Sequence, residues 1–411
     1  MEKLNKRISI VFAILVTIFI CLTAIGPKDN LFGHQEYVFF NGGNDLFADY
    51  FNVHRFIAEQ DPYFNEMVSN YLPLSYLLLM PLNQVCDYAH MTQDDCYTCN
   101  VAVISAVVFL IISLFFFFDS LNRLSNKQGW RIFNTFLLLF SSIFLYSIER
   151  GNMVFLAAAG VNYFLVYYDA KTAWTRRFGL SCLCIAAVLK IFPVLFGILL
   201  LRDKRYRDIA FCIITGLILT FLPFLYFEHG FGNIPRLIDE LRAHMAIAAL
   251  PDTVYKFGIH SLTQMIIFAI NYLNPGQIVA PTIAMWTIGT KVLTAILACV
   301  SLVLAFLEKQ RWMQIGLIAM VIMLFPTDSY FYSGLYLIPM IVLFLNKREL
   351  NKMDYVVAVL LCLIMNPVQL VYGPVSLSAV IINIFSIILW ILLIVYSSIN
   401  TFGKTKHIQA Q

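Results

Sequence analysis

Residues 100–118 read NVAVISAVVFLIISLFFFF and contain no charged side chain. A helix needs about 20 predominantly apolar residues to cross a bilayer, and about 17 is the lower limit. This run therefore predicts a membrane-spanning helix. Comparable runs occur at 8–25, 132–148, 153–168, 209–227, 283–307, 354–371 and 377–399, and shorter ones at 312–325 and 332–346.

The overall composition supports the same fold class. Of 411 residues, 60% are hydrophobic and 13% are charged, whereas a soluble protein has about 25% charged residues. We expect an all-α polytopic membrane helix bundle forming one domain over 1–411, with about 10–13 membrane helices and re-entrant or interfacial helices in its external loops. No small-residue cleavage site follows the run at 8–25, which predicts a retained anchor and not a signal peptide.

Basic residues are distributed unevenly between alternate loops. If the N-terminus is cytoplasmic, most of the 28 Lys and Arg residues fall in cytoplasmic segments. The segments on the other side contain only Lys28, Arg55, Arg150, Arg236, Arg242 and Lys256. Because Lys and Arg accumulate in cytoplasmic loops, we expect a multi-pass plasma-membrane protein with both termini in the cytoplasm. Loops 27–99 and 228–259 are then external.

The first external loop contains a charge-rich stretch at 41–62, NGGNDLFADYFNVHRFIAEQDP. Asp45 and Asp49 are four residues apart and would share one face of a helix. Leu46, Tyr50, Val53 and Ile57 would form an apolar stripe along the same helix. An amphipathic helix of this kind is typical of a membrane surface. Asp45 is a candidate catalytic base there, and the alternative is an N-cap of the helix.

Several further positions are functional candidates. Residues 179–201 have basic clusters on both sides, so the segment is expected to enter the membrane and return, with its turn at 190–193. Lys190 at that turn is a candidate phosphate ligand, and the alternative is a lysine that reaches the interface. Arg150 follows the run at 132–148. It is either a cation beside the carboxylates or part of a turn with a solvated ion pair. Asp328 is expected to cap a helix.

Metal, nucleotide and nucleic-acid sites are not indicated by the sequence. Cys96 and Cys99 have no second cysteine pair or suitably spaced histidine, so a zinc site is not expected. A disulfide among Cys86, Cys96 and Cys99 requires an oxidising compartment. No Walker loop, dinucleotide fingerprint or basic aromatic patch is present. We therefore expect no metal, no cofactor and no nucleic-acid partner.

Together the candidates point to a class of chemistry. The external side has the carboxylates Asp45 and Asp49, with Arg150 and His260, while Lys190 approaches from within the membrane. A carboxylate can deprotonate an acceptor hydroxyl, and cations can stabilise a departing phosphate. This combination indicates group transfer from a phosphorylated lipid. A lipid-linked oligosaccharide flippase or other transporter and a polysaccharide polymerase remain alternatives, although no inverted repeat is evident.

The order of several short motifs resembles glycosyltransferase family 87. The motifs are Asp45-Leu46-x-x-Asp49-Tyr50, Asp61-Pro62-Tyr63, Tyr71-x-Pro73-Leu74, Met80-Pro81-Leu82, Arg150-Gly151-Asn152, the segment 186–193, His260-Ser261-Leu262 and the segment 325–330. The family pattern has Gly-Gln-x-Asn at the fifth motif and Asn-Gln-Ser-Leu at the seventh. The sequence departs from both, so the resemblance does not identify the sugar.

The resemblance implies a GT-C fold and a mannosyltransferase-like activity that uses a polyprenyl-phosphate sugar and inverts the anomeric carbon. It implies that Asp45 is the base, that Lys190 lies near the donor phosphate and that His260 belongs to the donor site. Asp49 and Arg150 are then expected to bind substrate. The implied partners are a polyprenyl-phosphate sugar donor, a glycolipid or glycan acceptor of the cell envelope, and membrane lipids.

Overall fold

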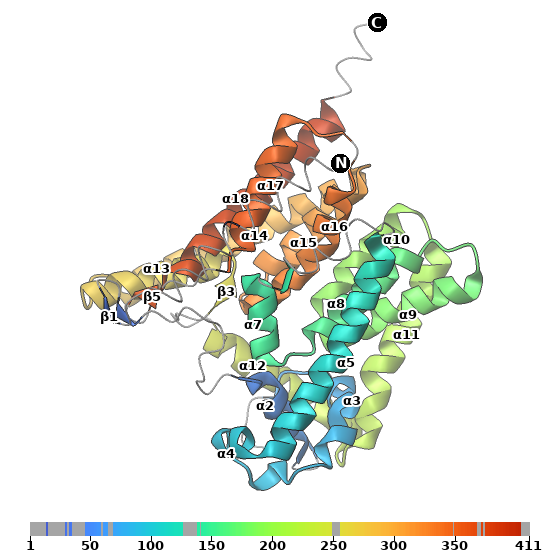
Figure 1. The fold of residues 1–411 in the computed structure, drawn as a ribbon, viewed down its shortest axis with the longest axis vertical. Coiled ribbons are helices and arrows are strands. Elements are labelled where there is room, and N and C mark those ends of the chain that lie inside the picture. The colour runs from blue at the N-terminus through green and yellow to red at the C-terminus, as the bar shows by residue number, and fades with distance from the viewer. Residues whose placement is uncertain are drawn as a thin grey trace, which may run out of the picture. The chain divides into compact units, whose positions relative to one another are not determined.

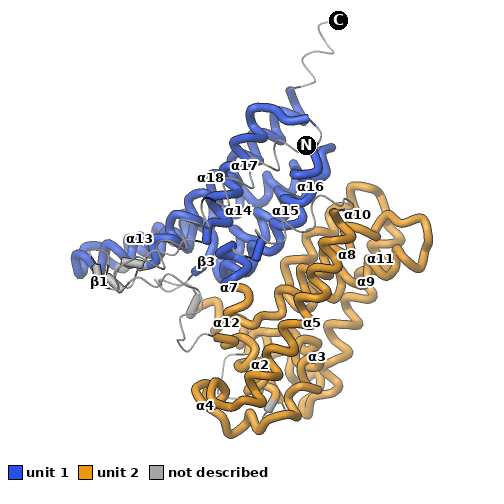
Figure 2. The backbone as a smooth tube through the Cα atoms, viewed as in Figure 1, with its two compact units in different colours: residues 1–41, 127–146, 249–411 blue, residues 42–126, 147–248 orange. Residues whose placement is uncertain are grey.

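Helices dominate the computed structural model of the chain (Figure 1), which confirms the expected all-α bundle. It describes residues 14, 29–30, 33–34, 46–58, 61–64, 69–125, 138–139, 141–248, 255–347, 349–367, 371–372 and 375–403. By internal contacts the chain divides into two compact units, each built from separate stretches of sequence (Figure 2). Unit 1 comprises Met1–Asn41, Lys127–Tyr146 and Ala249–Gln411, and unit 2 comprises Gly42–Asn126 and Ser147–Ala248.

Unit 2 contains the first described helices and the middle of the chain. Its elements are α2 (Ala48–Ala58), α3 (Pro73–Asn83), η1 (Tyr88–His90), α4 (Gln93–Thr98), α5 (Asn100–Ser125), α8 (Val154–Tyr167), α9 (Ala173–Leu189), η3 (Phe192–Gly197), α10 (Ile198–Arg202), α11 (Tyr206–Phe221), η4 (Leu222–Tyr226), η5 (Gly230–Gly232) and α12 (Asn233–Ala248). Helix α7 (Ser142–Arg150) crosses the boundary between the units.

The centre of unit 2 is α8, which packs against both α5 and α9. Its segment Ala157–Ala158–Ala159–Gly160 is buried. A Cβ atom at Gly160 would lie 2.6 Å from the carbonyl oxygen of Cys182. The small side chains of α8 therefore let α9 approach closely, as small residues do between membrane helices.

Unit 1 contains the C-terminal part of the chain. Its elements are β1 (Asp29–Asn30), β2 (Gly33–His34), β3 (Lys256–Phe257), α13 (Ile259–Leu273), α14 (Ala280–Leu307), α15 (Arg311–Leu324), β4 (Ser329–Tyr330), η6 (Phe331–Leu337), α16 (Ile338–Leu345), α17 (Lys352–Ile364), β5 (Val371–Tyr372), β6 (Val375–Ser376) and α18 (Leu377–Phe402). Helix α15 is buried from Trp312 to Leu324 and packs against α14, α16 and α18. Strands β3 and β4 pair antiparallel, with Lys256 opposite Tyr330.

Four helices of the described residues are long and apolar enough to cross a membrane: Asn100–Ser125, Tyr206–Tyr226, Pro281–Leu307 and Leu377–Phe402. They coincide with the apolar runs at 100–118, 209–227, 283–307 and 377–399. The runs at 153–168 and 354–371 give helices of only 14 and 13 residues, α8 and α17. These two are too short to span as single straight helices. The run at 8–25 lies almost entirely outside the described residues.

The local predictions for the loops had mixed outcomes. The helix breaks where the turn was expected, since α9 ends at Leu189 and η3 begins at Phe192, while entry into the membrane and return stay a prediction. The single helix expected through Asp45 and Asp49 is wrong, because Leu46 and Phe47 form a turn and α2 begins at Ala48. The apolar stripe is largely confirmed, with Tyr50, Val53 and Ile57 buried.

Candidate functional site

The start of α2 is fixed by the turn between α7 and α8. Phe47 has a positive φ of 55°, and its backbone N–H donates a hydrogen bond to the carbonyl of Glu149. Gly151 also has a positive φ, of 60°, and a Cβ atom there would lie 3.1 Å from Cδ1 of Phe47 and 3.2 Å from Cβ of Tyr50. Glycine at 151 therefore satisfies two requirements at once, the left-handed backbone and the close approach to α2.

This close approach brings both neighbours of Gly151 onto Asp49. The Nε atom of Arg150 donates to Oδ1 of Asp49 at 3.1 Å, and Nη2 donates to the same oxygen. The amide of Asn152 donates to Oδ2 at 2.6 Å. The side chains of Asp49 and Arg150 are 13% and 16% exposed. Asp49 thus has a guanidinium on one oxygen and an amide on the other, and these donors fix the orientation of its carboxylate.

Tyr71 connects this pair to Lys190. The Asn152 amide also lies 3.3 Å from the hydroxyl of Tyr71, to which it donates. The Nζ atom of Lys190 lies 4.8 Å from the centre of the Tyr71 ring, a cation–π distance. Lys190 directly follows Leu189, the last residue of α9, and its φ of −147° lies outside the helical region. The helix end thus presents an ammonium to the face of a tyrosine.

Three of the five predicted site residues therefore belong to one cluster in unit 2. Asp49 and Arg150 are in direct contact, and Lys190 joins them through Tyr71 and Asn152. Asn152 and Tyr71 were not predicted as site residues, although both stand in the short motifs at 150–152 and 71–74. Asp45 lies outside the described residues, and no geometry is assigned to it.

A second polar cluster surrounds Asp61, which belongs to the motif Asp61-Pro62-Tyr63 and was not predicted as a site residue. Its buried carboxylate accepts hydrogen bonds from Nδ1 of His229 and Nδ2 of Asn233, each at 2.9 Å, and from the backbone N–H of Tyr63 at 3.1 Å. Burial alone would raise the pKa of Asp61, but these hydrogen bonds hold the pKa below its usual value. Asp61 therefore joins the first predicted external loop to the second.

Further contacts between the two loops surround the Asp61 cluster. The ring of Phe64 stacks on His229 at 3.8 Å between centroids, and the guanidinium of Arg236 lies 5.0 Å from the Phe64 ring. Nε of Arg236 also donates to the carbonyl of Tyr63 at 3.2 Å. The parts of the two predicted external loops around Phe64 and His229 thus pack against each other within unit 2. Helix α12 extends from Asn233 to Ala248.

His260 belongs to unit 1, where it lies in the first turn of α13 and is 5% exposed. Among the described residues, neither of its ring nitrogens has a hydrogen-bond partner, and the same holds for Oγ of Ser261 and Oε1 of Gln264. Buried polar atoms are normally satisfied. The group of unsatisfied polar atoms makes the first turn of α13 a candidate site for a polar ligand.

Lys256 and Asp328 form an ion pair in the same unit. Their Nζ and Oδ1 atoms are 3.2 Å apart, and the side chains are 7% and 17% exposed. Asp328 was expected to cap the helix that follows, and this prediction is wrong. The N-cap of η6 is Tyr330. Within the described parts of the chain, no three His, Cys, Asp or Glu side chains are grouped so that they could hold a metal ion.

Comparison with known proteins identifies one family. The family model of glycosyltransferase family 87 matches residues 71–327. The matched region contains Arg150, Asn152, Lys190 and His260, whereas Asp45 and Asp49 precede it. No curated protein matches the chain.

Proposed function

This chain belongs to glycosyltransferase family 87, and on that premise we propose that it transfers a mannose-like hexose from a polyprenyl-phosphate sugar. The acceptor is a glycolipid or a glycan of the cell envelope, and the transfer takes place on the extracytoplasmic face of the plasma membrane. The glycosyltransferase activity and the membrane helices follow from the family and the fold. The donor, the acceptor and the face are the content of the proposal.

One observation carries the proposal: the cluster of Asp49, Arg150, Asn152, Tyr71 and Lys190 in unit 2. At the end of α9, Lys190 holds its ammonium against the ring face of Tyr71. Such a cation suits the phosphate of a departing lipid phosphate. Arg150 is already paired with Asp49, so in this proposal it shapes the site and Lys190 meets the phosphate.

The proposed reaction is a single displacement. The acceptor hydroxyl oxygen bonds to the anomeric carbon while the bond from that carbon to the phosphate oxygen breaks, so the configuration inverts. The carboxylate of Asp45 takes the hydroxyl proton, and the bonding electron pair leaves with the polyprenyl phosphate. Lys190 stabilises the added negative charge of that leaving group. No metal or cofactor takes part in this scheme.

Asp49 has a positioning role in the proposal. Its Oδ1 accepts a hydrogen bond from Arg150 and its Oδ2 accepts one from Asn152. Because both oxygens are occupied, Asp49 orients these two residues and does not contact the acceptor in this proposal. His260 remains the proposed donor-binding residue of unit 1. Its unsatisfied ring nitrogens are suited to hydroxyl groups of a sugar.

The test is transfer by the purified protein. Wild-type protein is incubated with radiolabelled polyprenyl-phosphate mannose and with acceptors extracted from the host membrane, and both labelled product and released polyprenyl phosphate are measured. Lys190→Met is expected to lower donor use about ten- to hundredfold, because a charge-assisted contact is lost. Lys171→Met, which changes an exposed lysine in the segment between α8 and α9, is the matched control and should behave as wild type.

The outcomes separate the alternatives. A transporter would move the donor without releasing polyprenyl phosphate, and a polymerase would require a second lipid-linked glycan in place of a monosaccharide donor. Release of polyprenyl phosphate with equal rates in wild type and Lys190→Met would remove Lys190 from the donor site. Use of a nucleotide sugar in place of the lipid phosphate sugar would overturn the proposed donor class.

A further inference from the structure

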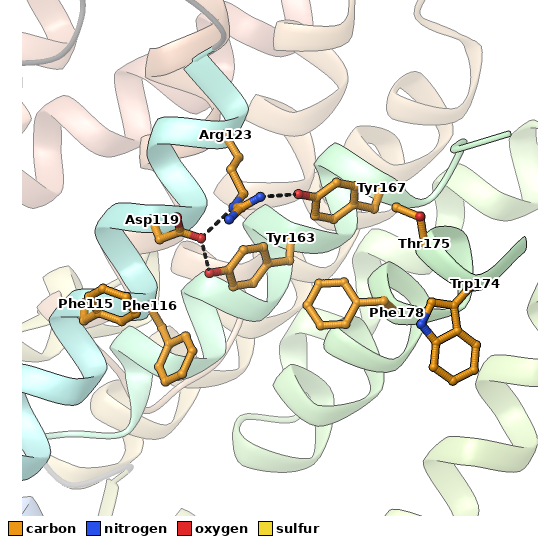
Figure 3. A pocket seen from close by; sticks show the side chains of 9 residues that line it. All are labelled: Phe115, Phe116, Asp119, Arg123, Tyr163, Tyr167, Trp174, Thr175 and Phe178. Carbon is orange, nitrogen blue, oxygen red and sulfur yellow. Dashed lines mark hydrogen bonds and ion pairs between the residues drawn. The ribbon is translucent and has the colours of Figure 1, made fainter. Parts of the chain in front are cut away.

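A pocket with a volume of about 500 Å³ lies in unit 2 on one side of α5, α8 and α9 (Figure 3). This volume is in the range of small-molecule sites. The pocket is at the end of the candidate span α5, since Arg123 is in the last turn of that helix. Its lining residues are Phe115, Phe116, Asp119, Arg123, Tyr163, Tyr167, Trp174, Thr175 and Phe178.

A hydrogen-bonded network forms the polar side of the pocket. Oδ2 of Asp119 accepts hydrogen bonds from Nε of Arg123 at 2.6 Å and from the hydroxyl of Tyr163 at 2.7 Å. Nη1 of Arg123 donates to the hydroxyl of Tyr167 at 2.9 Å. Figure 3 shows these three contacts as one chain of side chains. The network fixes a carboxylate and a guanidinium side by side at the edge of the apolar layer.

The network leaves one donor of the guanidinium and one oxygen of the carboxylate available to a ligand. In the described part of the chain, Nη2 of Arg123 and Oδ1 of Asp119 make no hydrogen bond, and these side chains are 49% and 28% exposed. The Tyr167 hydroxyl accepts from Arg123 and keeps its own proton to donate. The pocket thus offers two donors for an anion and one carboxylate oxygen for a cation, with no net charge.

Aromatic side chains and Thr175 form the rest of the pocket, and aliphatic side chains of α5 lie beyond it. The rings of Phe116, Phe178 and Trp174 are exposed beside the network, Trp174 by 80%. On α5 the exposed residues Ile111, Ile112 and Phe115 precede Asp119 on the same side of the helix at helical spacing. An apolar strip thus leads from the charged pair toward the middle of the span.

We propose that this pocket binds one phospholipid whose headgroup carries a phosphate next to a primary ammonium. The phosphate accepts hydrogen bonds from Arg123 and Tyr167, and the ammonium donates to Asp119 between the aromatic rings. An acyl chain lies along the apolar strip of α5. The site is separate from the cluster of Asp49 and Lys190, and it does not depend on the proposed reaction.

Charge complementarity selects this headgroup over a purely anionic one. A lipid with a phosphate alone would satisfy Arg123 but would bring negative charge close to Asp119. A quaternary ammonium could meet the rings but could not donate a hydrogen bond to the carboxylate. The acyl chain distinguishes a lipid from the free headgroup, because burying methylene groups against the exposed side of α5 strengthens binding.

The test measures lipid binding to delipidated protein by native mass spectrometry. The probes are dioleoyl phosphatidylethanolamine, the matching phosphatidylcholine, phosphatidylglycerol and phosphatidic acid, and soluble phosphoethanolamine. Phosphatidylethanolamine is expected to bind most tightly, and soluble phosphoethanolamine is expected not to displace it. Tighter binding of phosphatidylglycerol or phosphatidylcholine, or equal competition by phosphoethanolamine, would overturn the proposal.

Variants connect that preference to the pocket. Asp119→Asn and Arg123→Gln are each expected to weaken phosphatidylethanolamine binding about tenfold or more, and Asp119→Asn should also remove the preference over phosphatidic acid. Tyr167→Phe removes one hydroxyl only, so it remains informative if a charge variant does not fold, and a severalfold loss is expected. Unchanged binding in Asp119→Asn or in Tyr167→Phe would place the lipid elsewhere.

The chain offers a matched control pair. Arg202 donates to Asp203 at 3.1 Å, and Asp203 also accepts from the hydroxyl of Tyr168 at 3.0 Å. This repeats the arginine, aspartate and tyrosine combination outside the pocket. Arg202→Gln should therefore leave the lipid preference unchanged. An equal loss in Arg202→Gln and Arg123→Gln would indicate a general charge effect and would contradict the assigned site.

Discussion

Arg150 is bonded to Asp49 across 101 residues of sequence, with Nε 3.1 Å from Oδ1. The pair is largely withdrawn from solvent, with side-chain exposures of 16% and 13%. Removal of one partner from such a pair leaves the other charge without compensation, which costs more than the pair itself contributes. The contact therefore holds the turn between α7 and α8 on the first turn of α2.

Arg150→Gln is expected to destabilise the protein by about 3 kcal/mol, since the Asp49 carboxylate would keep only the Asn152 amide. The double variant Asp49→Asn, Arg150→Gln removes both charges and should recover part of this loss. Thermal unfolding of the wild type, both single variants and the double variant gives the coupling energy. A coupling near zero would mean that the two side chains are independent.

Gly151→Ala should destabilise the same region by about 1–3 kcal/mol through backbone strain and crowding. The φ of Gly151 is 60°, and an added Cβ would be 3.1–3.2 Å from atoms of Phe47 and Tyr50. Gly216→Ala in α11 is the control, because nothing lies within 4 Å of a Cβ there. The control should be neutral or stabilising by up to about 1 kcal/mol. Equal melting temperatures for both variants would contradict the close packing at Gly151.

His54 predicts a pH dependence of stability. Burial lowers the pKa of this side chain to about 4, although Nδ1 is hydrogen-bonded to Oδ1 of Asn83 at 2.9 Å. In the unfolded chain the pKa is about 6.5. Above that pH neither state binds the proton, and between pH about 6.5 and about 4 only the unfolded state binds it. Stability should therefore fall by about 3 kcal/mol as the pH decreases through this range.

The measurement is the melting temperature of wild type and His54→Phe from pH 8 to about 4. Phenylalanine keeps the aromatic packing beside Tyr50 and Tyr88 and cannot bind a proton. The difference between the two proteins should grow in favour of the variant below about pH 6.5. Parallel curves would show that His54 is protonated in the folded state as readily as in the unfolded chain.

The proposed orientation can be tested with single cysteines in a cysteine-free background. Asp94 in α4 and Lys171 between α8 and α9 are both exposed, so access to the reagent depends on the side of the membrane. Asp94→Cys should react with an impermeant maleimide in intact cells, and Lys171→Cys should react only after permeabilisation. Labelling of Lys171→Cys in intact cells would overturn the orientation. Ser69 is unsuitable for this purpose because it is fully buried.

Local sequence patterns predicted the parts of the fold that depend on neighbouring residues. The apolar runs gave the helices α5, α11, α14 and α18 as candidate spans, since length and hydropathy decide that property. The helix break at Lys190 and the buried side of α2 were predicted for the same reason. In the site, the types of Arg150 and Lys190 marked them as candidates, because a charge between or within apolar runs requires a partner.

Local sequence patterns could not predict which residues far apart in the sequence come into contact. Asp61 meets His229 and Asn233 across 168 and 172 residues, and only the fold brings them together. The late start of α2, at Ala48 and not near Asp45 as predicted, has a similar cause. Phe47 takes a left-handed backbone conformation that is uncommon for residues other than glycine. The hydrogen bond from its backbone N–H to the carbonyl of Glu149 stabilises this conformation.

The two roles considered for Asp45, base and N-cap, stay predictions because this residue lies outside the described part of the chain. Asn caps a helix as well as Asp does, so Asp45→Asn would preserve a cap. Asp45→Asn keeps the size of the side chain but cannot accept a proton. If Asp45 is the base, the variant should express normally and transfer sugar about 10²–10⁴-fold more slowly.

Asp49→Asn should behave differently, because it acts through Arg150. The variant loses the charge that holds the guanidinium, so its melting temperature should fall together with a milder loss of activity. Asp94→Asn, an exposed carboxylate in the same predicted external loop, is the control for both and should match wild type in both measurements. Transfer rate and melting temperature are measured on the same preparations. A fully active Asp45→Asn beside an inactive, stable Asp49→Asn would move the base to Asp49, and two fully active variants would remove the carboxylate mechanism.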